Sequence, residues 1–256
     1  MSPTLNITHI GTATAILEIN GFNMLTDPFF SPAGSTWPIT DEVSLTVEDD
    51  PALRLEQLPV IDAVLLSHED HPDNLDELGR RLLDGRRVFT TVDGAKNLSS
   101  RPGVHGLKPW EKIDTIIAGQ KLQIIGTPTQ HLPGGECTGF IITGEGFGTG
   151  RDGLPNAIWF SGDTVYIDEL KKMADEQRTC PANLEDPNGP LMQITMDGKS
   201  AARLFREIKA DVLVPMHYES WGHFTQFGKE LAEDFESESV MDKVCWLKPG
   251  EAVSVL

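Results

Sequence analysis

Cysteines are few in this sequence of 256 residues, and they are widely separated. The three thiols belong to Cys137, Cys180 and Cys245, and no two of them form a CxxC pair. This spacing excludes a zinc ribbon and does not support a disulfide framework, because both require clustered cysteines. We therefore expect three reduced, buried thiols.

Basic residues and long apolar runs are also scarce. The 21 Lys and Arg residues are outnumbered by 39 Asp and Glu, which gives a formal net charge of −18. Such a surface repels nucleic acids and anionic membranes. No apolar run approaches the ~18 residues of a membrane span, and the N-terminus lacks the basic start and apolar core of a signal peptide. We expect a cytoplasmic protein that binds neither nucleic acid nor membrane. The possibility of a homo-oligomer stays open.

Glycine and proline, in contrast, are frequent, at 24 and 17 residues. They separate short segments rich in apolar and β-branched residues, a pattern typical of strands. The turn Asn20-Gly21 predicts a hairpin of 13–19 and 22–26. Further strands are predicted at 60–67, 88–92, 113–117, 121–127, 138–143, 157–161, 211–216, 244–247 and 252–256. The last two are expected to pair around the turn at 248–251, and the Pro- and Gly-rich segment 31–40 is expected to be a loop.

Helical periodicity is found at 75–85, 166–176, 199–209 and 228–235. Asp73 or Asn74 is placed to cap the first of these helices, and Gly85 to end it. Strands with intervening and terminal helices favour a layered α/β fold, with residues 1–256 in a single domain.

The segment SHEDHPDNLDE at 67–77 places two histidines and several carboxylates between a buried strand and a helix. Imidazole nitrogen and carboxylate oxygen are the usual ligands of catalytic zinc. Other candidates, His131, Asp163 and His217, each follow a predicted strand. Taken singly, each is more often an ordinary hydrogen-bonding residue. Because strand ends meet in layered α/β domains, we expect these segments to form one site.

Nearly the whole chain resembles the metallo-β-lactamase superfamily, particularly its lactonase-like and phospholipase-like branch. The motifs that carry the resemblance occur in the family's order and approximate spacing: HIGTATAILEI, MLTDP, LLSHEDHPDNLDE, PTQHLPG, FSGDTVY and PMHY. The resemblance implies a four-layer αββα sandwich and a metal-dependent hydrolase. It also implies one or two divalent ions, most simply Zn2+, with Mn2+ or another divalent metal as the alternative.

The same resemblance implies two metal positions with one shared ligand. The implied ligands are His68, His71 and His131 for the first position, Asp73 and His217 for the second, and Asp163 between them. The histidine-rich loop carries one extra residue and has Asn74 where the family's last histidine stands, so Asp70 is an alternative to His71. Asp73 and Asp163 are the implied catalytic residues, which would orient the attacking water and pass its proton to the leaving group.

Trp37, Trp221 and His223 are candidates for substrate binding, because ligand sites usually have apolar and aromatic walls. A structural role is the alternative for each. In the family resemblance, the polar segment 177–196 replaces an apolar strand, which predicts a shortened sheet there.

We expect a small-molecule substrate, with a lactone or lactam as the leading class. A phosphodiesterase or phospholipase-D-like hydrolase is the first alternative. It ranks lower because the sequence has no dense Lys/Arg cluster and no amphipathic membrane helix. The second alternative is a metal-binding protein without turnover.

Overall fold

The computed structural model describes residues 4–38, 44–131, 136–150, 153–175 and 194–255. Its larger sheet has seven strands in the order β13-β1-β2-β3-β6-β7-β8. The strands from β13 to β3 pair antiparallel, whereas β3, β6, β7 and β8 run parallel. Their bounds are β1 (Leu5–Gly11), β2 (Thr14–Ile19), β3 (Phe22–Thr26), β6 (Ala63–Leu65), β7 (Arg87–Thr91), β8 (Val104–Leu107) and β13 (Ala252–Ser254).

A second, antiparallel sheet has four strands in the order β12-β11-β10-β9, and β4 and β5 form a separate hairpin. These strands are β9 (Lys112–Ile117), β10 (Gln120–Thr127), β11 (Gly139–Gly144), β12 (Ile158–Phe160), β4 (Thr36–Pro38) and β5 (Ser44–Thr46). The α-helices are α1 (Glu77–Arg80), α2 (Val92–Asn97), α3 (Gly198–Glu207) and α4 (Gly228–Ser237). The 3-10 helices are η1 (Leu55–Gln57), η2 (Glu145–Phe147), η3 (Asp168–Asp175) and η4 (Met241–Lys243).

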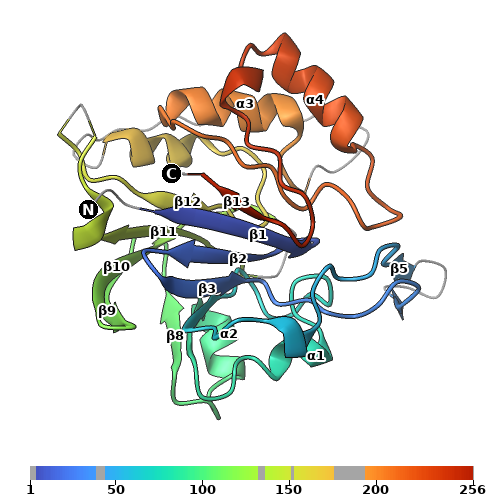
Figure 1. The fold of residues 1–256 in the computed structure, drawn as a ribbon, viewed down its shortest axis with the longest axis vertical. Coiled ribbons are helices and arrows are strands. Elements are labelled where there is room, and N and C mark those ends of the chain that lie inside the picture. The colour runs from blue at the N-terminus through green and yellow to red at the C-terminus, as the bar shows by residue number, and fades with distance from the viewer. Residues whose placement is uncertain (1–3, 39–43, 132–135, 151–152, 176–193, 256) are drawn as a thin grey trace.

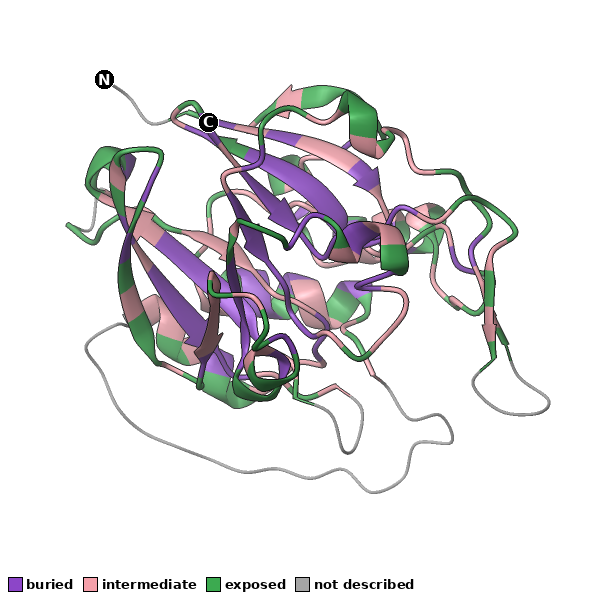
Figure 2. Cartoon of the chain, turned by 90° about the horizontal axis from the view of Figure 1, so that it is seen from below, coloured by how far each residue is buried: buried purple, intermediate pink, exposed green. Residues whose placement is uncertain are grey.

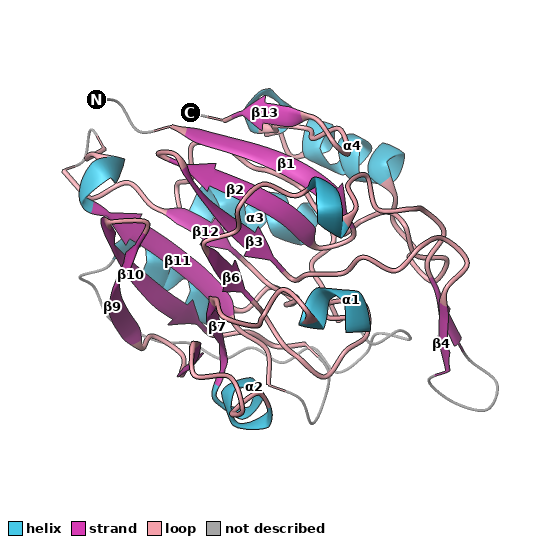
Figure 3. Ribbon diagram, turned by 60° about the horizontal axis from the view of Figure 1, so that its bottom comes forward, coloured by secondary structure: helices cyan, strands magenta, loops and turns pink. Residues whose placement is uncertain are grey.

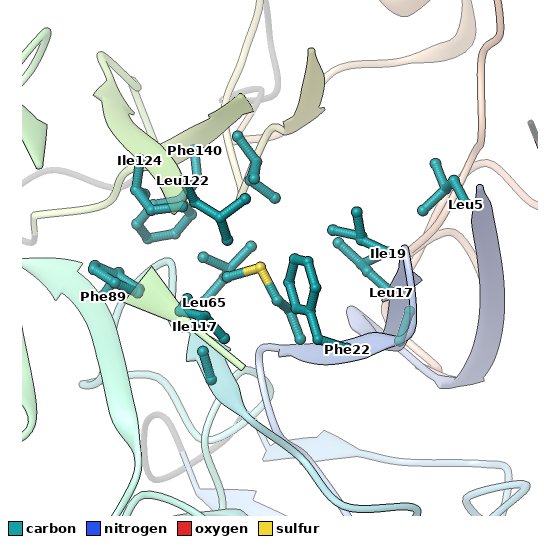
Figure 4. Close-up of a cluster of buried hydrophobic side chains, with 14 of the residues drawn as sticks. Leu5, Leu17, Ile19, Phe22, Leu65, Phe89, Ile117, Leu122, Ile124 and Phe140 are labelled. Atoms are coloured by element: carbon teal, nitrogen blue, oxygen red, sulfur yellow. The ribbon is translucent and has the colours of Figure 1, made fainter. Parts of the chain in front are cut away.

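The two sheets pack face to face over the main core. Alternating side chains of the larger sheet, such as Leu17 and Leu65, meet Ile124 and Phe140 of the smaller sheet (Figure 4). Their neighbours Ile16 and Val64 point to the other face, because successive side chains of a strand alternate. That outer face packs against the segment around α1, whereas α3 and α4 lie on the opposite side of the molecule (Figure 1). The layers therefore run helix, sheet, sheet, helix, as the resemblance implies, and Figure 2 shows the burial of the central strands.

The predicted N-terminal hairpin is confirmed, with β2 and β3 joined at Asn20 and Gly21. Both turn residues have positive φ, 48° and 87°, as a two-residue turn of this kind requires. The strands predicted at 88–92, 113–117, 121–127, 138–143 and 157–161 lie within a residue or two of β7, β9, β10, β11 and β12. The sequence patterns did not predict β8 or α2.

The C-terminal prediction is wrong in its pairing. β13 pairs with β1 instead of with 244–247. Residues 211–216 and 244–247 run side by side, joined by one isolated parallel bridge between Leu213 and Val244, and belong to neither sheet. The segment at 248–251 leads away to β1, where the Gly250 N–H donates to the His9 carbonyl at 2.8 Å.

The helix predicted at 75–85 is also wrong in extent, because α1 has only four residues. Its N-cap is Asp76, whose carboxylate accepts from the Gly79 N–H at 2.7 Å. Asn74 is turned inward to Asp27 instead. The helix predicted at 166–176 is the 3-10 helix η3, and the loop predicted at 31–40 contains β4 (Figure 3).

Two predictions fall partly outside the described residues. Cys180 lies there, whereas Cys137 and Cys245 are free thiols and are partly buried. Most of the segment 177–196 lies there as well. No helix among the described residues has the length and apolar character that a membrane crossing needs.

Candidate metal centre

Six of the predicted ligands lie together in two adjoining groups. The histidine group is His68, His71 and His131, and the carboxylate group is Asp73, Asp163 and His217. Within each group, the potential ligand atoms all lie within 4.8 Å of one another. Asp70 belongs to neither group and is exposed to solvent.

The strand arrangement explains this convergence. β10 and β12 both pair antiparallel with β11, so their carboxyl ends lie at the same edge of the smaller sheet. His131 follows β10, and Asp163 follows β12. The loop with His68 follows β6 of the facing sheet, and the Thr138 N–H donates to the Ser67 carbonyl at 3.0 Å across the two sheets.

Asp163 lies between the groups and presents one oxygen to each. Its Oδ2 is 3.9 Å from His131 Nε2, and its Oδ1 is 3.4 Å from His217 Nδ1. On the far side, His217 Nε2 is 3.9 Å from Asp73 Oδ2. This placement matches the bridging role that the family resemblance implies for Asp163.

His68 is oriented by a chain of hydrogen bonds on the side of its ring that faces away from the histidine group. His68 Nε2 faces His71 Nδ1 at 2.9 Å, while His68 Nδ1 lies 2.9 Å from the Ser67 hydroxyl. That hydroxyl donates to Asp27 Oδ2 at 2.7 Å. The chain is satisfied when His68 carries its proton on Nδ1, which leaves the Nε2 lone pair facing the histidine group.

His131 is oriented in the same manner, because its Nδ1 lies 2.7 Å from the Ile194 carbonyl, an acceptor only. Its Nε2 is therefore left unprotonated toward Asp163 in the neutral ring. Two imidazoles of the histidine group thus have the tautomer that a metal ligand needs.

Sequence reasoning did not assign a role to Asp27, although it lies in the MLTDP motif. Its side chain is fully buried and accepts from the Ser67 N–H at 2.6 Å and from Asn74 Nδ2 at 2.9 Å. Burial raises the pKa of Asp27 to about 8, against the opposing effect of these donors. Only its inward position, which the motif does not reveal, identifies it as the anchor of the histidine loop.

Burial and mutual charge set the protonation of the two groups. Burial lowers the pKa of His68 to about 3, so the ring is neutral. Burial alone would raise the pKa of Asp163, but four neighbouring histidines hold it below its ordinary value. Burial raises the pKa of Asp73, and His217 opposes this. A metal binds to imidazoles in their neutral form and to carboxylates in their ionised form, and the shifts of His68 and Asp163 favour these forms.

The donor set also passes a direct test of fit for a metal ion. His217 Nδ1 is buried and has no hydrogen-bond partner among the described residues. The residue also has a left-handed backbone, with φ of 58°, and its N–H donates to the Thr12 carbonyl at 3.2 Å. A buried nitrogen without a partner is costly unless an unseen ligand satisfies it, and a cation at the group would do so.

The predicted substrate-binding residues lie beside the carboxylate group but differ in access. Trp221 is fully buried, Trp37 is partly buried, and His223 is exposed. Trp221 packs at ring distances of 5.3 Å from Phe29 and 5.8 Å from Trp37. Phe224, whose ring is 5.3 Å from that of His217, brings this aromatic cluster next to the site. Because Trp221 is enclosed, it supports the wall and does not form its surface.

Comparison with known proteins identifies the family. Residues 22–218 match the model of a β-lactamase superfamily domain. The chain belongs to this superfamily. Its mixed α/β fold is the metallo-β-lactamase fold, and it is a metal-dependent hydrolase.

Individual relatives are similar over their full length but distant in sequence. The chain is 26% identical to a UPF0173 metal-dependent hydrolase of Methanopyrus kandleri, with 97% of this chain and 99% of the relative covered. Among solved structures, an isothiocyanate hydrolase from Delia radicum gut bacteria has a TM-score of 0.73 at 22% identity, covering 97% and 98% of the two chains. A metallo hydrolase from Ignicoccus hospitalis has a TM-score of 0.69 at 23% identity, covering 99% of each chain.

Proposed function

We propose that the chain hydrolyses a small cyclic ester or amide, such as a lactone or lactam, at the two donor groups. The observation that carries this proposal is the position of Asp163, which presents one carboxylate oxygen to each group. The histidine group and the carboxylate group would each hold a divalent ion. Imidazole ligands favour Zn2+, with Mn2+ as the alternative.

Metal ions at these positions would lower the pKa of a water and polarise the scissile carbonyl. The side chains have separate tasks. Asp163 is held ionised by the surrounding histidines, so it serves as the fixed negative charge of the site. Asp73 is suited to take the proton of the attacking water and return it to the leaving atom, because burial raises its pKa above the ordinary value of an aspartate.

The access to these groups favours a small substrate. Side-chain exposures are 7% for His131, 8% for Asp163, 11% for His217 and 14% for Asp73. The ligand atoms are thus largely enclosed, and the Phe224 ring lies 5.3 Å from that of His217. A hollow of about 320 Å³ near β1 and β2 is lined by none of these residues and has no part in the proposal.

A second candidate is the hydrolysis of an isothiocyanate, because a structural neighbour that covers nearly the whole chain is an isothiocyanate hydrolase. Both candidates require attack of water on an electrophilic carbon. They differ in the leaving group, because hydrolysis of a cyclic ester leaves the acid and the alcohol in one molecule.

The test is elemental analysis of the purified protein together with hydrolysis of a lactone, a lactam, an isothiocyanate and a phosphodiester. Each assay is run before chelation, after chelation and after metal restoration. We expect bound metal and restorable lactone or lactam hydrolysis. Restorable hydrolysis of only the phosphodiester or the isothiocyanate would reassign the substrate, and metal without any turnover would indicate a binding protein.

The matched variants are His131→Ala and His105→Ala. His131 belongs to the histidine group, whereas His105 is in β8 and stacks on Phe89 at a ring distance of 5.7 Å. We expect loss of metal and of activity only in the first variant. Full metal content and full hydrolysis in His131→Ala would refute the proposal.

A further inference from the structure

The turn between β1 and β2 has a strained backbone that its residue types do not favour. Gly11 pairs with Thr14, so Thr12 and Ala13 are the two turn residues, and Thr12 has a left-handed φ of 48°. The next turn, at 20–21, meets the same requirement with Asn and Gly, whereas a β-branched residue rarely adopts a positive φ. Contacts made elsewhere in the structure must therefore impose this conformation.

The side chain of Thr12 does not supply these contacts. Thr12 is 3% exposed, and its hydroxyl is buried without a hydrogen-bond partner among the described residues. Its backbone carbonyl, in contrast, accepts from the His217 N–H at 3.2 Å and lies 3.0 Å from His9 Nε2. A carbonyl oxygen only accepts, so the His9 ring carries a proton on Nε2 and donates it. The strained peptide thus joins two histidines from distant segments.

His9 is itself held in place by β1. The pairing of β1 with β2 shifts its register between His9 and Gly11, as at a β-bulge. Bulges re-aim side chains and are frequent beside active sites. The His9 carbonyl accepts from the Gly250 N–H at 2.8 Å, which fixes the backbone of His9. Burial lowers the pKa of His9, and the residue belongs to neither donor group. Its ring therefore serves as a neutral hydrogen-bond donor.

The backbone of His217 is strained as well, with a left-handed φ of 58°. A hydrogen bond between two strained residues, Thr12 and His217, lies directly beside the carboxylate group. Strained residues cluster at active sites and persist only where the surrounding structure over-determines them. Residues that orient a metal ligand from outside contribute about 10–100-fold to metal affinity.

We propose that His9 is a positioning residue for His217 and acts through the Thr12 carbonyl. The His9 ring holds this carbonyl in the orientation in which it accepts from the His217 N–H. That hydrogen bond fixes the backbone of His217 and so directs its imidazole to the carboxylate group. The inference rests on the metal centre of the proposed function but not on the substrate.

The test compares His9→Leu with His9→Gln in the full chain loaded with Co2+. Leucine removes the donor, whereas the glutamine amide can donate in place of Nε2. We expect His9→Leu to shift the visible absorption bands of bound Co2+ and to lower the Co2+ affinity by about 10-fold. His9→Gln should restore both. The matched control is His105→Leu, because His105 stacks on Phe89 and belongs to neither donor group. It should leave the bands and the affinity unchanged.

Two results would overturn the inference and leave the proposed function intact. The first is a wild-type spectrum and affinity in His9→Leu. The second is an equal change in the leucine and glutamine variants, because packing of the ring would then be responsible and not its hydrogen bond.

If His9→Leu does not fold, nitrogen-15 NMR of the histidine rings in the metal-free wild-type protein decides the question. We expect the proton of His9 on Nε2, and a proton on Nδ1 instead would contradict the inference. A wild-type protein that binds no Co2+ would refute the metal centre and the inference together. Co2+ binding without hydrolysis of any substrate, with the expected changes in His9→Leu, would refute only the proposed function.

Discussion

Two of the three segments that bring histidines to the site are held by different forces. The loop at 67–74 is anchored by side-chain hydrogen bonds to the buried carboxylate of Asp27. The segment at 217–224 is anchored by backbone hydrogen bonds to its neighbours, such as Gly222 N–H to the Thr46 carbonyl at 3.3 Å, and by the enclosed ring of Trp221. The first loop should therefore respond most to the loss of a side-chain hydrogen bond, and the second to the loss of buried packing.

Trp221→Ala should give the largest effect, because it empties the aromatic cluster beneath the second loop. We expect a loss of about 3–5 kcal/mol in the free energy of unfolding. Denaturant titration of the metal-free protein measures it. Phe227→Ala, at a residue that is 39% exposed, is the control and should cost far less. Equal losses in the two variants would show that the second loop does not depend on this packing.

Ser67→Ala should act on the first loop through ligand orientation. It breaks the link from Asp27 to His68, so we expect metal affinity to fall by about 10–100-fold. A competitive chelator titration measures this fall. Ser99→Ala, at an exposed serine beyond α2, provides the comparison. Unchanged metal affinity in Ser67→Ala would show that the hydrogen bonds of Ser67 do not orient His68 for metal binding.

The pH dependence of stability separates the loops further. Burial lowers the pKa of His68 to about 3, from 6.5 in the unfolded chain. Between these values the unfolded chain binds a proton at His68 that the folded protein does not bind. His68 therefore makes the free energy of unfolding fall as pH falls. The contribution is complete above pH 6.5 and changes by about 1.4 kcal/mol per pH unit between pH 6.5 and about pH 3. Asp27 has a raised pKa and therefore the opposite effect: it makes the free energy of unfolding fall as pH rises from 3.8 to about 8.

The difference between wild type and His68→Asn isolates the histidine contribution, since Asp27 is present in both proteins. Urea titrations of the metal-free proteins from pH 4 to pH 7 would measure it. We expect the stability advantage of wild type over the variant to shrink as pH falls. A constant difference would mean that His68 is not held neutral by burial.

Phe224→Ala should have the smallest effect, confined to substrate binding at the second loop. Its ring borders His217 and is partly exposed. We expect KM to rise several-fold, equivalent to about 1 kcal/mol, with kcat little changed. A fall in kcat without a change in KM would instead place the ring in the support of His217.

Local patterns were sufficient for the elements with strong sequence signals. The turn Asn20-Gly21 fixed the first hairpin, and the short apolar segments of the smaller sheet were found at nearly their observed bounds. Prediction failed where tertiary pairing decided the outcome. Residues 244–247 have the composition of a strand, but they run beside 211–216 and lie outside both sheets.

The candidate site divides in the same way. The sequence by itself indicated the family and the six candidate donor residues, because residue types and spacing survive in the motifs. It left Asp70 and His71 as alternative ligands, and Asp73 and Asn74 as alternative helix caps. The tertiary structure placed His71 with the other histidines, turned Asn74 toward Asp27, and enclosed Trp221. Those choices depend on burial and on hydrogen bonds between residues about 40 or more positions apart, such as Ser67 and Asp27, which no local pattern encodes.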